Sequence, residues 1–89
     1  LNTVTKKLII TVRVNEYMSR DVNRNVPFTP DEIAETAAEC RAAGAAIIHF
    51  HARTPDGGKC HEPEVYAEIV AKIREKCDII INNSTGGGI

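Results

Sequence analysis

Two histidines separated by one residue lie in the stretch AIIHFHARTPDGG, residues 46–58. His49 and His51 end an apolar run. Because side chains alternate along a β-strand, both rings face the same side, with their Cα atoms roughly 6.5 to 7 Å apart. Two imidazoles at this separation can bind one cation through nitrogen atoms about 2.0 to 2.1 Å from it. The alternative is one satisfied core histidine and one loop residue. We predict a metal site.

Polar residues also follow the other two apolar runs of the chain. Asn15 and Glu16 come after residues 7–14, and Asn83 and Ser84 follow the last apolar run. A carboxylate at Glu16 is a candidate metal ligand or general base, and a solvated loop glutamate is the alternative. Three runs that each end in polar residues indicate one shared site at one edge of a sheet.

Two further features of the chain are candidates for binding an anionic substrate. The guanidinium of Arg53 can pair with a substrate carboxylate or, equally, with a neighbouring acidic side chain. The segment STGGG (84–88) offers hydroxyls from Ser84 and Thr85 and glycine N–H groups that a ligand can approach closely. It matches neither the P-loop nor the GxGxxG pattern. A plain turn is the alternative for this segment.

The order of elements that must position these residues is β-α-β-α-β. We predict strands at about 7–14, 46–51 and 78–83, and helices at about 30–43 and 62–76. The middle strand is apolar on both faces, which indicates a parallel sheet buried on both sides. With right-handed crossovers the three strands are adjacent, as in a doubly wound sheet or part of a (β/α)8 TIM barrel.

The first helix has clear signals at both ends. Thr29 is the expected N-cap, Pro30 suits the first helical position, and Glu32 completes a capping box. Gly44 is the expected left-handed residue after the helix. In the second helix the apolar residues recur at helical spacing and predict one buried face: Val65, Tyr66, Ile69, Val70 and Ile73.

Composition excludes several classes of protein. The net charge of the 89 residues is −1, with no run of one sign, which gives no basis for binding nucleic acid or an anionic membrane. No stretch is apolar enough to predict a transmembrane helix. Three widely spaced cysteines indicate reduced thiols and a cytoplasmic protein. The chain starts without Met and ends in a glycine run, so we expect the N-terminal portion of a longer protein.

Several stretches together resemble the β-keto acid cleavage enzyme family. They are LIITVRVNE, VPFTPDEIAETAAECRAAGAAIIHFHAR, PDGG and IINNSTGGG, in the family's order and spacing across nearly all of residues 7–88. The resemblance implies a (β/α)8 barrel that binds a divalent cation, usually Zn²⁺, and that assembles as a homo-oligomer in the full-length protein. It also implies a further glutamate ligand and a catalytic Asp and Arg, all beyond Ile89.

The resemblance also implies roles for residues of this chain. The family's two metal-ligating histidines correspond to His49 and His51. The serine that helps to hold the keto acid corresponds to Ser84, with a nearby amide from Gly87, and an acidic pocket residue corresponds best to Glu16. The implied reaction is a retro-Claisen exchange between a β-keto acid and acetyl-CoA that gives acetoacetate and a new acyl-CoA. The metal would act as a Lewis acid on the substrate oxygens.

Two other interpretations stay open. A metal-dependent hydrolase of the amidohydrolase type also uses an HxH pair, although there the pair usually ends the first strand rather than the second. A non-catalytic α/β fragment with structural histidines is the second. A whole barrel has eight strands and eight helices in about 250 residues, whereas three strands and two helices are predicted in this chain. We therefore expect the 89 residues alone to be inactive and weakly stable.

Overall fold

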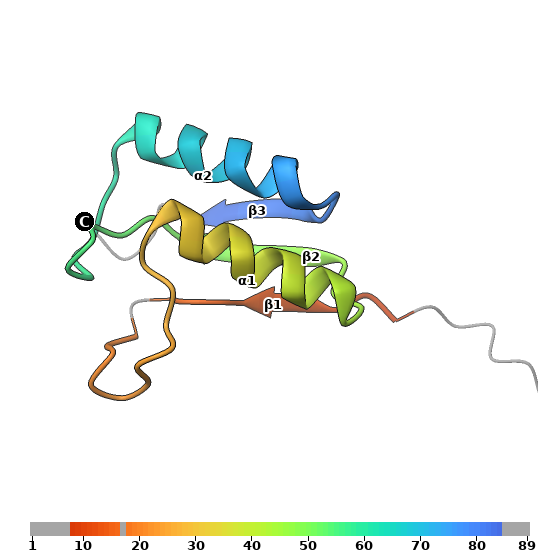
Figure 1. Ribbon diagram of the computed structural model, residues 1–89, viewed down its shortest axis with the longest axis horizontal. Coiled ribbons are helices and arrows are strands. Elements are labelled where there is room, and N and C mark those ends of the chain that lie inside the picture. Colours follow the sequence, from red (N-terminus) through yellow and green to blue (C-terminus); the bar gives the residue numbers. More distant parts are fainter. Residues whose placement is uncertain (1–7, 17, 85–89) are drawn as a thin grey trace, which may run out of the picture.

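The computed structural model describes residues 8–16 and 18–84 (Figure 1). Its elements follow the order β1 (Thr11–Arg13), α1 (Pro30–Ala42), β2 (Ile47–His51), α2 (Pro63–Lys76) and β3 (Ile80–Ser84). The strands form one parallel sheet in the order β1-β2-β3. The predicted β-α-β-α-β segment with three adjacent parallel strands is confirmed.

The first strand is shorter than the predicted range 7–14. β1 has three residues and pairs with β2. Pairing nevertheless extends beyond both ends of β1: the backbone N–H of Ala46 donates to the carbonyl of Ile10, and that of Val14 donates to the carbonyl of His49. The chain therefore follows β2 as far as the residue just before Asn15.

Both helices lie on the same side of the sheet (Figure 1). Ile48 and Phe50 point from β2 into the core that these helices cover, and both side chains are fully buried. Ile79, just before β3, also belongs to this core, and the helices contribute the other large side chains of the cluster: Ile33, Tyr66, Ile69 and Ile73. Val65 and Val70 pack against them at the margin. The predicted buried face of the second helix is therefore confirmed.

No helix among residues 8–16 and 18–84 covers the opposite face of the sheet (Figure 1). Ile47 and His49 on this face are only half-buried, and Ile80 is 60% exposed. Burial of apolar surface stabilises a protein by about 25 cal/mol per Å², and the exposed part of the Ile80 side chain does not gain this stabilisation. This open face carries the histidine pair.

The ends of α1 form as the sequence predicts. The side chain of Thr29 accepts a hydrogen bond from the N–H of Glu32, whose carboxylate accepts one from the N–H of Thr29. Gly44 follows the helix with a φ of +113°, a conformation that a Cβ atom would strain. These signals set the direction in which the chain enters β2.

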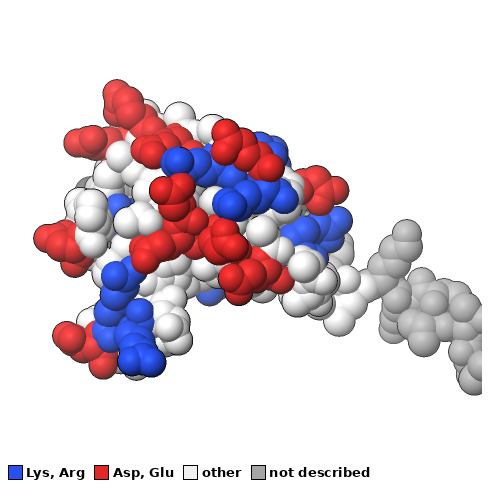
Figure 2. All heavy atoms as spheres, in the orientation of Figure 1, with Lys and Arg blue, Asp and Glu red and all other residues white. Residues whose placement is uncertain are grey.

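Charges on the helical face are mixed in sign. Figure 2 shows acidic and basic side chains interspersed over this face, and two ion pairs join the helices. Lys72 lies 3.0 Å from Asp31, and Lys76 lies 3.1 Å from Glu35. Such exposed pairs contribute about 0 to 1 kcal/mol each, so the apolar core holds the helices together. None of the helices in the described part is long and apolar enough to cross a membrane.

Candidate metal centre

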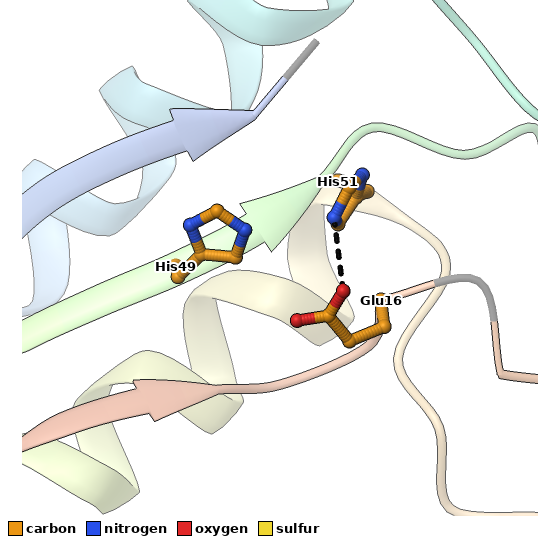
Figure 3. Close-up of side chains that lie close together, drawn as sticks. All are labelled: Glu16, His49 and His51. Carbon is orange, nitrogen blue, oxygen red and sulfur yellow. Dashed lines mark ion pairs between the residues drawn. The ribbon is translucent and has the colours of Figure 1, made fainter. Parts of the chain in front are cut away.

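Glu16, His49 and His51 come together at the carboxyl ends of β1 and β2 (Figure 3). His49 is in register with Arg13, the last residue of β1, and His51 is the last residue of β2. The chain leaves the sheet at Glu16, where φ is 43°. This left-handed turn lets a side chain from the end of β1 reach the end of β2.

The three side chains have the donor atoms and the spacing of a cation site. One ligand atom from each residue lies within 4.8 Å of the other two. Nε2 of His51 is 3.3 Å from Oε2 of Glu16 (Figure 3). Donors bound at about 2.0 to 2.1 Å to a tetrahedral zinc ion lie about 3.4 Å apart, so this pair already has the required separation. Two imidazoles and a carboxylate are ligands that zinc accepts.

The two imidazole rings lie on one side of β2, as strand alternation predicts. Their centroids are 5.3 Å apart and the ring planes meet at 76°. His49 is half-buried on the open face, whereas His51 is 5% exposed because the turn after β1 covers it. One imidazole is therefore partly exposed on the open face and the other is enclosed by protein.

The surroundings of His51 favour its neutral form. Burial is the largest effect and lowers the pKa of its imidazole below the ordinary value of 6.5; the carboxylate of Glu16 opposes this, and His49 lowers the pKa further. A histidine must be deprotonated at the nitrogen that binds a metal. The site thus keeps His51 ready to act as a ligand near neutral pH.

The carboxylate of Glu16 contacts two partners through its two oxygens. Oε1 accepts a hydrogen bond from Nη1 of Arg13 at 3.3 Å, and Oε2 faces Nε2 of His51. The Glu16 side chain is 44% exposed, so the ion pair with Arg13 is screened by solvent. A half-exposed carboxylate beside a buried imidazole can bind a cation or exchange a proton with a substrate.

The predicted substrate-binding loop is only partly within the described residues. Ser84 is the last residue of β3, where its backbone is in register with His51. The third strand therefore ends at the same edge as the histidine pair. Thr85 and Gly87 lie outside the described residues. Their roles, and the role of the Ser84 hydroxyl, stay predictions.

The guanidinium of Arg53 donates hydrogen bonds to backbone carbonyl groups. Its guanidinium donates to the carbonyl of Gly57 at 3.0 and 2.6 Å and to that of Met18 at 2.5 Å. It also stacks 4.2 Å from the ring centre of Phe28, and the residue is 6% exposed. These contacts support a structural role that joins the loop after β1 to the turn after β2. Binding of a substrate carboxylate by Arg53 stays a prediction.

Asn15 is a residue of this site whose role the sequence did not indicate. It is 3% exposed, and its side-chain amide bonds to the backbone of His51. The only signal in the sequence was its position immediately before Glu16, at the end of an apolar run.

Comparison with known proteins identifies the family. The model of the beta-keto acid cleavage enzyme family matches residues 7–89. The chain belongs to the β-keto acid cleavage enzyme family. The family match favours the keto acid interpretation of the sequence over an amidohydrolase-type hydrolase.

Three curated relatives show how much of a family member the chain spans. It is 42% identical over 86 residues to a 3-keto-5-aminohexanoate cleavage enzyme of Fusobacterium nucleatum, covering 94% of this chain and 32% of that protein. It is 44% identical over 63 residues to a 3,5-dioxohexanoate:acetyl-CoA acetone transferase of Paraburkholderia graminis, covering 70% of this chain and 20% of that protein. For a 3-dehydrocarnitine:acetyl-CoA trimethylamine transferase of Rhizobium meliloti the identity is 39%, over 72% of this chain and 22% of that protein. The chain thus spans about a third or less of these relatives.

Proposed function

We propose that this chain supplies half of the metal centre of an enzyme that exchanges a β-keto acid with acetyl-CoA, giving acetoacetate and a new acyl-CoA. The observation that carries the proposal is the convergence of Glu16, His49 and His51 at one sheet edge in a member of this family. The names of two of the relatives above contain acetyl-CoA as a substrate, each with a different keto acid.

We further propose that the three strands are part of a (β/α)8 barrel. Both described helices pack on one face of the sheet, and the histidines lie on the other, which would face the lumen. In such barrels the active site lies at the carboxyl ends of the strands, where the Glu16 cluster is found. The exposed side chain of Ile80 would then be covered by the remaining strands.

Each residue of the centre has a distinct part in the proposed chemistry. His49 and His51 would hold a divalent cation, of which zinc suits the donor set, and the cation would supply Lewis acidity to the keto acid. Glu16 would contribute Oε2, the oxygen that faces His51, either to the cation as a third ligand or to the substrate as a general base. Ser84 would donate its hydroxyl to the substrate carboxylate, with Thr85 and Gly87 beside it. Holding the acid at its carboxylate end presents its α-carbon to the thioester carbonyl, so that this carbon bonds to the acetyl group as acetoacetate while its bond to the keto carbon breaks and that acyl group passes to the CoA thiol.

Zinc-dependent stability tests the metal centre in the 89-residue chain. A ligand that binds only the folded state stabilises it by about 2.7 kcal/mol at a concentration of a hundred times Kd. We expect zinc to raise the melting temperature of the wild type and of His61→Gln, a matched control at an exposed histidine outside the cluster. The double variant His49→Gln/His51→Gln should show no zinc effect. Equal shifts in all three proteins would exclude this metal site.

A chimera tests the activity. Residues 7–84 of this chain would replace the matching segment of the Fusobacterium nucleatum relative, which supplies the other two thirds of the barrel. We expect acetyl-CoA-dependent consumption of 3-keto-5-aminohexanoate by the chimera, and at least a hundredfold loss of kcat on His49→Gln, about 2.7 kcal/mol of barrier. We expect no turnover by the 89 residues alone. A chimera that is folded, binds zinc and is inactive would refute the proposed reaction.

A further inference from the structure

The side-chain amide of Asn15 is bonded to both backbone groups of His51. Its Oδ1 accepts a hydrogen bond from the N–H of His51 at 2.9 Å, and its Nδ2 donates to the carbonyl of His51 at 2.8 Å. The second hydrogen on Nδ2 can serve the carbonyl of Pro27, 3.2 Å away. Asn15 is 3% exposed, so water does not compete for these bonds.

This amide takes the place of a peptide group in the sheet. The last backbone bond between the first two strands runs from the N–H of Val14 to the carbonyl of His49 at 3.2 Å. Two residues later along β2, the backbone N–H and carbonyl of His51 would pair with peptide groups of β1 if that strand continued. The chain instead turns away at Glu16 with a φ of 43°. The side chain of Asn15 supplies the donor and the acceptor that the main chain no longer provides.

The use of the Asn15 amide in place of a backbone peptide group has a geometric consequence for the metal centre. If β1 continued as a strand, its main chain would hold His51 and its side chains would alternate above and below the sheet. Because Asn15 holds His51 instead, the main chain is released to turn, and the carboxylate of Glu16 reaches within 3.3 Å of the His51 ring. The side chain of Asn15 thus fixes the backbone of His51 and the point at which the main chain turns to place Glu16.

We propose that Asn15 is a positioning residue that sets the separation of Glu16 and His51 for cation binding. The inference rests on the metal centre of the proposed function. An amide on a single methylene is required: Asp lacks the N–H donors, and Gln carries its amide one methylene further. The hydrogen bond to the carbonyl of Pro27 also joins Asn15 to the loop that precedes α1. Proline has no backbone N–H, so only a donor such as Nδ2 can bond to the backbone of this residue.

The test compares cation binding by four forms of the 89-residue chain: wild type, Asn15→Ala, Asn15→Gln and Thr29→Ala. The last is the matched control, because it removes a helix cap that is separate from the cluster. Zinc affinity is measured by competition with a chromophoric chelator, and Co²⁺ absorption bands report ligand geometry. Loss of a residue that holds a metal ligand in place typically lowers affinity 10- to 100-fold. We expect a loss of zinc affinity of about this size, with altered Co²⁺ bands, in both Asn15 variants. Neither change is expected in the wild type or in Thr29→Ala.

Each outcome decides the matter. Zinc affinities within twofold of wild type and unchanged Co²⁺ bands in both Asn15 variants would overturn the proposal while leaving the metal centre intact. A wild type that binds no zinc would remove the metal centre itself, and the positioning role with it. If only one Asn15 variant is folded by circular dichroism, that variant decides. If neither folds in saturating zinc while Thr29→Ala does, Asn15 is a folding residue and the proposal is wrong.

Discussion

Nε2 of His51, the last residue of β2, lies 3.3 Å from Oε2 of Glu16, which lies three residues after the end of β1. The contact depends on the left-handed backbone of Glu16, a conformation that costs a residue other than glycine roughly 1 to 2 kcal/mol. The protein therefore holds a carboxylate beside a buried imidazole at the expense of local backbone strain. Strain of this kind is concentrated at functional sites.

Replacing Glu16 by glycine and by alanine should separate this strain from the role of the carboxylate. Both variants remove the carboxylate, but only glycine adopts a φ of 43° without strain. We expect Glu16→Gly to be more stable than Glu16→Ala by about 1 kcal/mol in urea unfolding without metal. Zinc affinity should fall about tenfold or more in both, because a charge-assisted contact contributes about 1.5 to 3 kcal/mol. Equal stabilities would show that the turn carries no strain.

Arg53 and Arg20 offer a matched test of a structural arginine. Both stack on Phe28, with guanidinium carbons 4.2 and 4.0 Å from the ring centre. Arg53 is buried and donates to the carbonyls of Met18 and Gly57, whereas Arg20 forms a half-exposed pair with Glu32. Lysine lacks the planar fork that makes such multiple contacts.

We expect Arg53→Lys to lower the free energy of unfolding by about 2 to 3 kcal/mol, since it loses charge-assisted bonds in a buried setting. Arg20→Lys should cost about 1 kcal/mol or less. Urea titrations of the two variants check the difference. If Arg53→Lys unfolds like the wild type, and raises the KM for the keto acid in the chimera, the substrate-binding role predicted from the sequence would be favoured over the structural one.

The sequence predicted those features that depend on local spacing. A period of two residues placed His49 and His51 on the same side of β2, and a three-residue spacing predicted the capping box of Thr29 and Glu32. Both follow from the geometry of a single element, which neighbouring elements do not change.

Features that depend on tertiary contacts could not be predicted in the same way. The reach of Glu16 depends on a turn that is possible because Asn15 replaces a peptide group of the sheet. The sequence predicted a substrate carboxylate or a neighbouring acid as the partner of Arg53, and in the structure its guanidinium donates to the backbone carbonyls of Met18 and Gly57. Neither partner can be recognised by residue type, since every residue carries a carbonyl.

The stability of the chain in acid should depend on Glu32. Hydrogen bonding from the backbone N–H of Thr29 is the largest cause that lowers the pKa of this carboxyl below its ordinary value of 4.5, and the N–H of Phe28 and the charge of Arg20 add to it. Its pKa is therefore lower in the folded than in the unfolded state. Between the two values the unfolded state binds more protons, so stability is present above pH 4.5 and is lost as the pH falls below it.

Glu32→Gln removes this titration, so its free energy of unfolding should fall less steeply below pH 4.5 than that of the wild type. Thr29→Ala serves as the control: it removes the side-chain cap, about 1 kcal/mol, and the smaller effect of the Thr29 side chain on the pKa of Glu32, but keeps the backbone N–H that lowers this pKa most. Its curve of stability against pH should therefore run below that of the wild type and nearly parallel to it. Urea unfolding at intervals from pH 7 to about pH 3 measures all three curves. A Glu32→Gln curve as steep as that of the wild type would show that other carboxyl groups govern the acid transition.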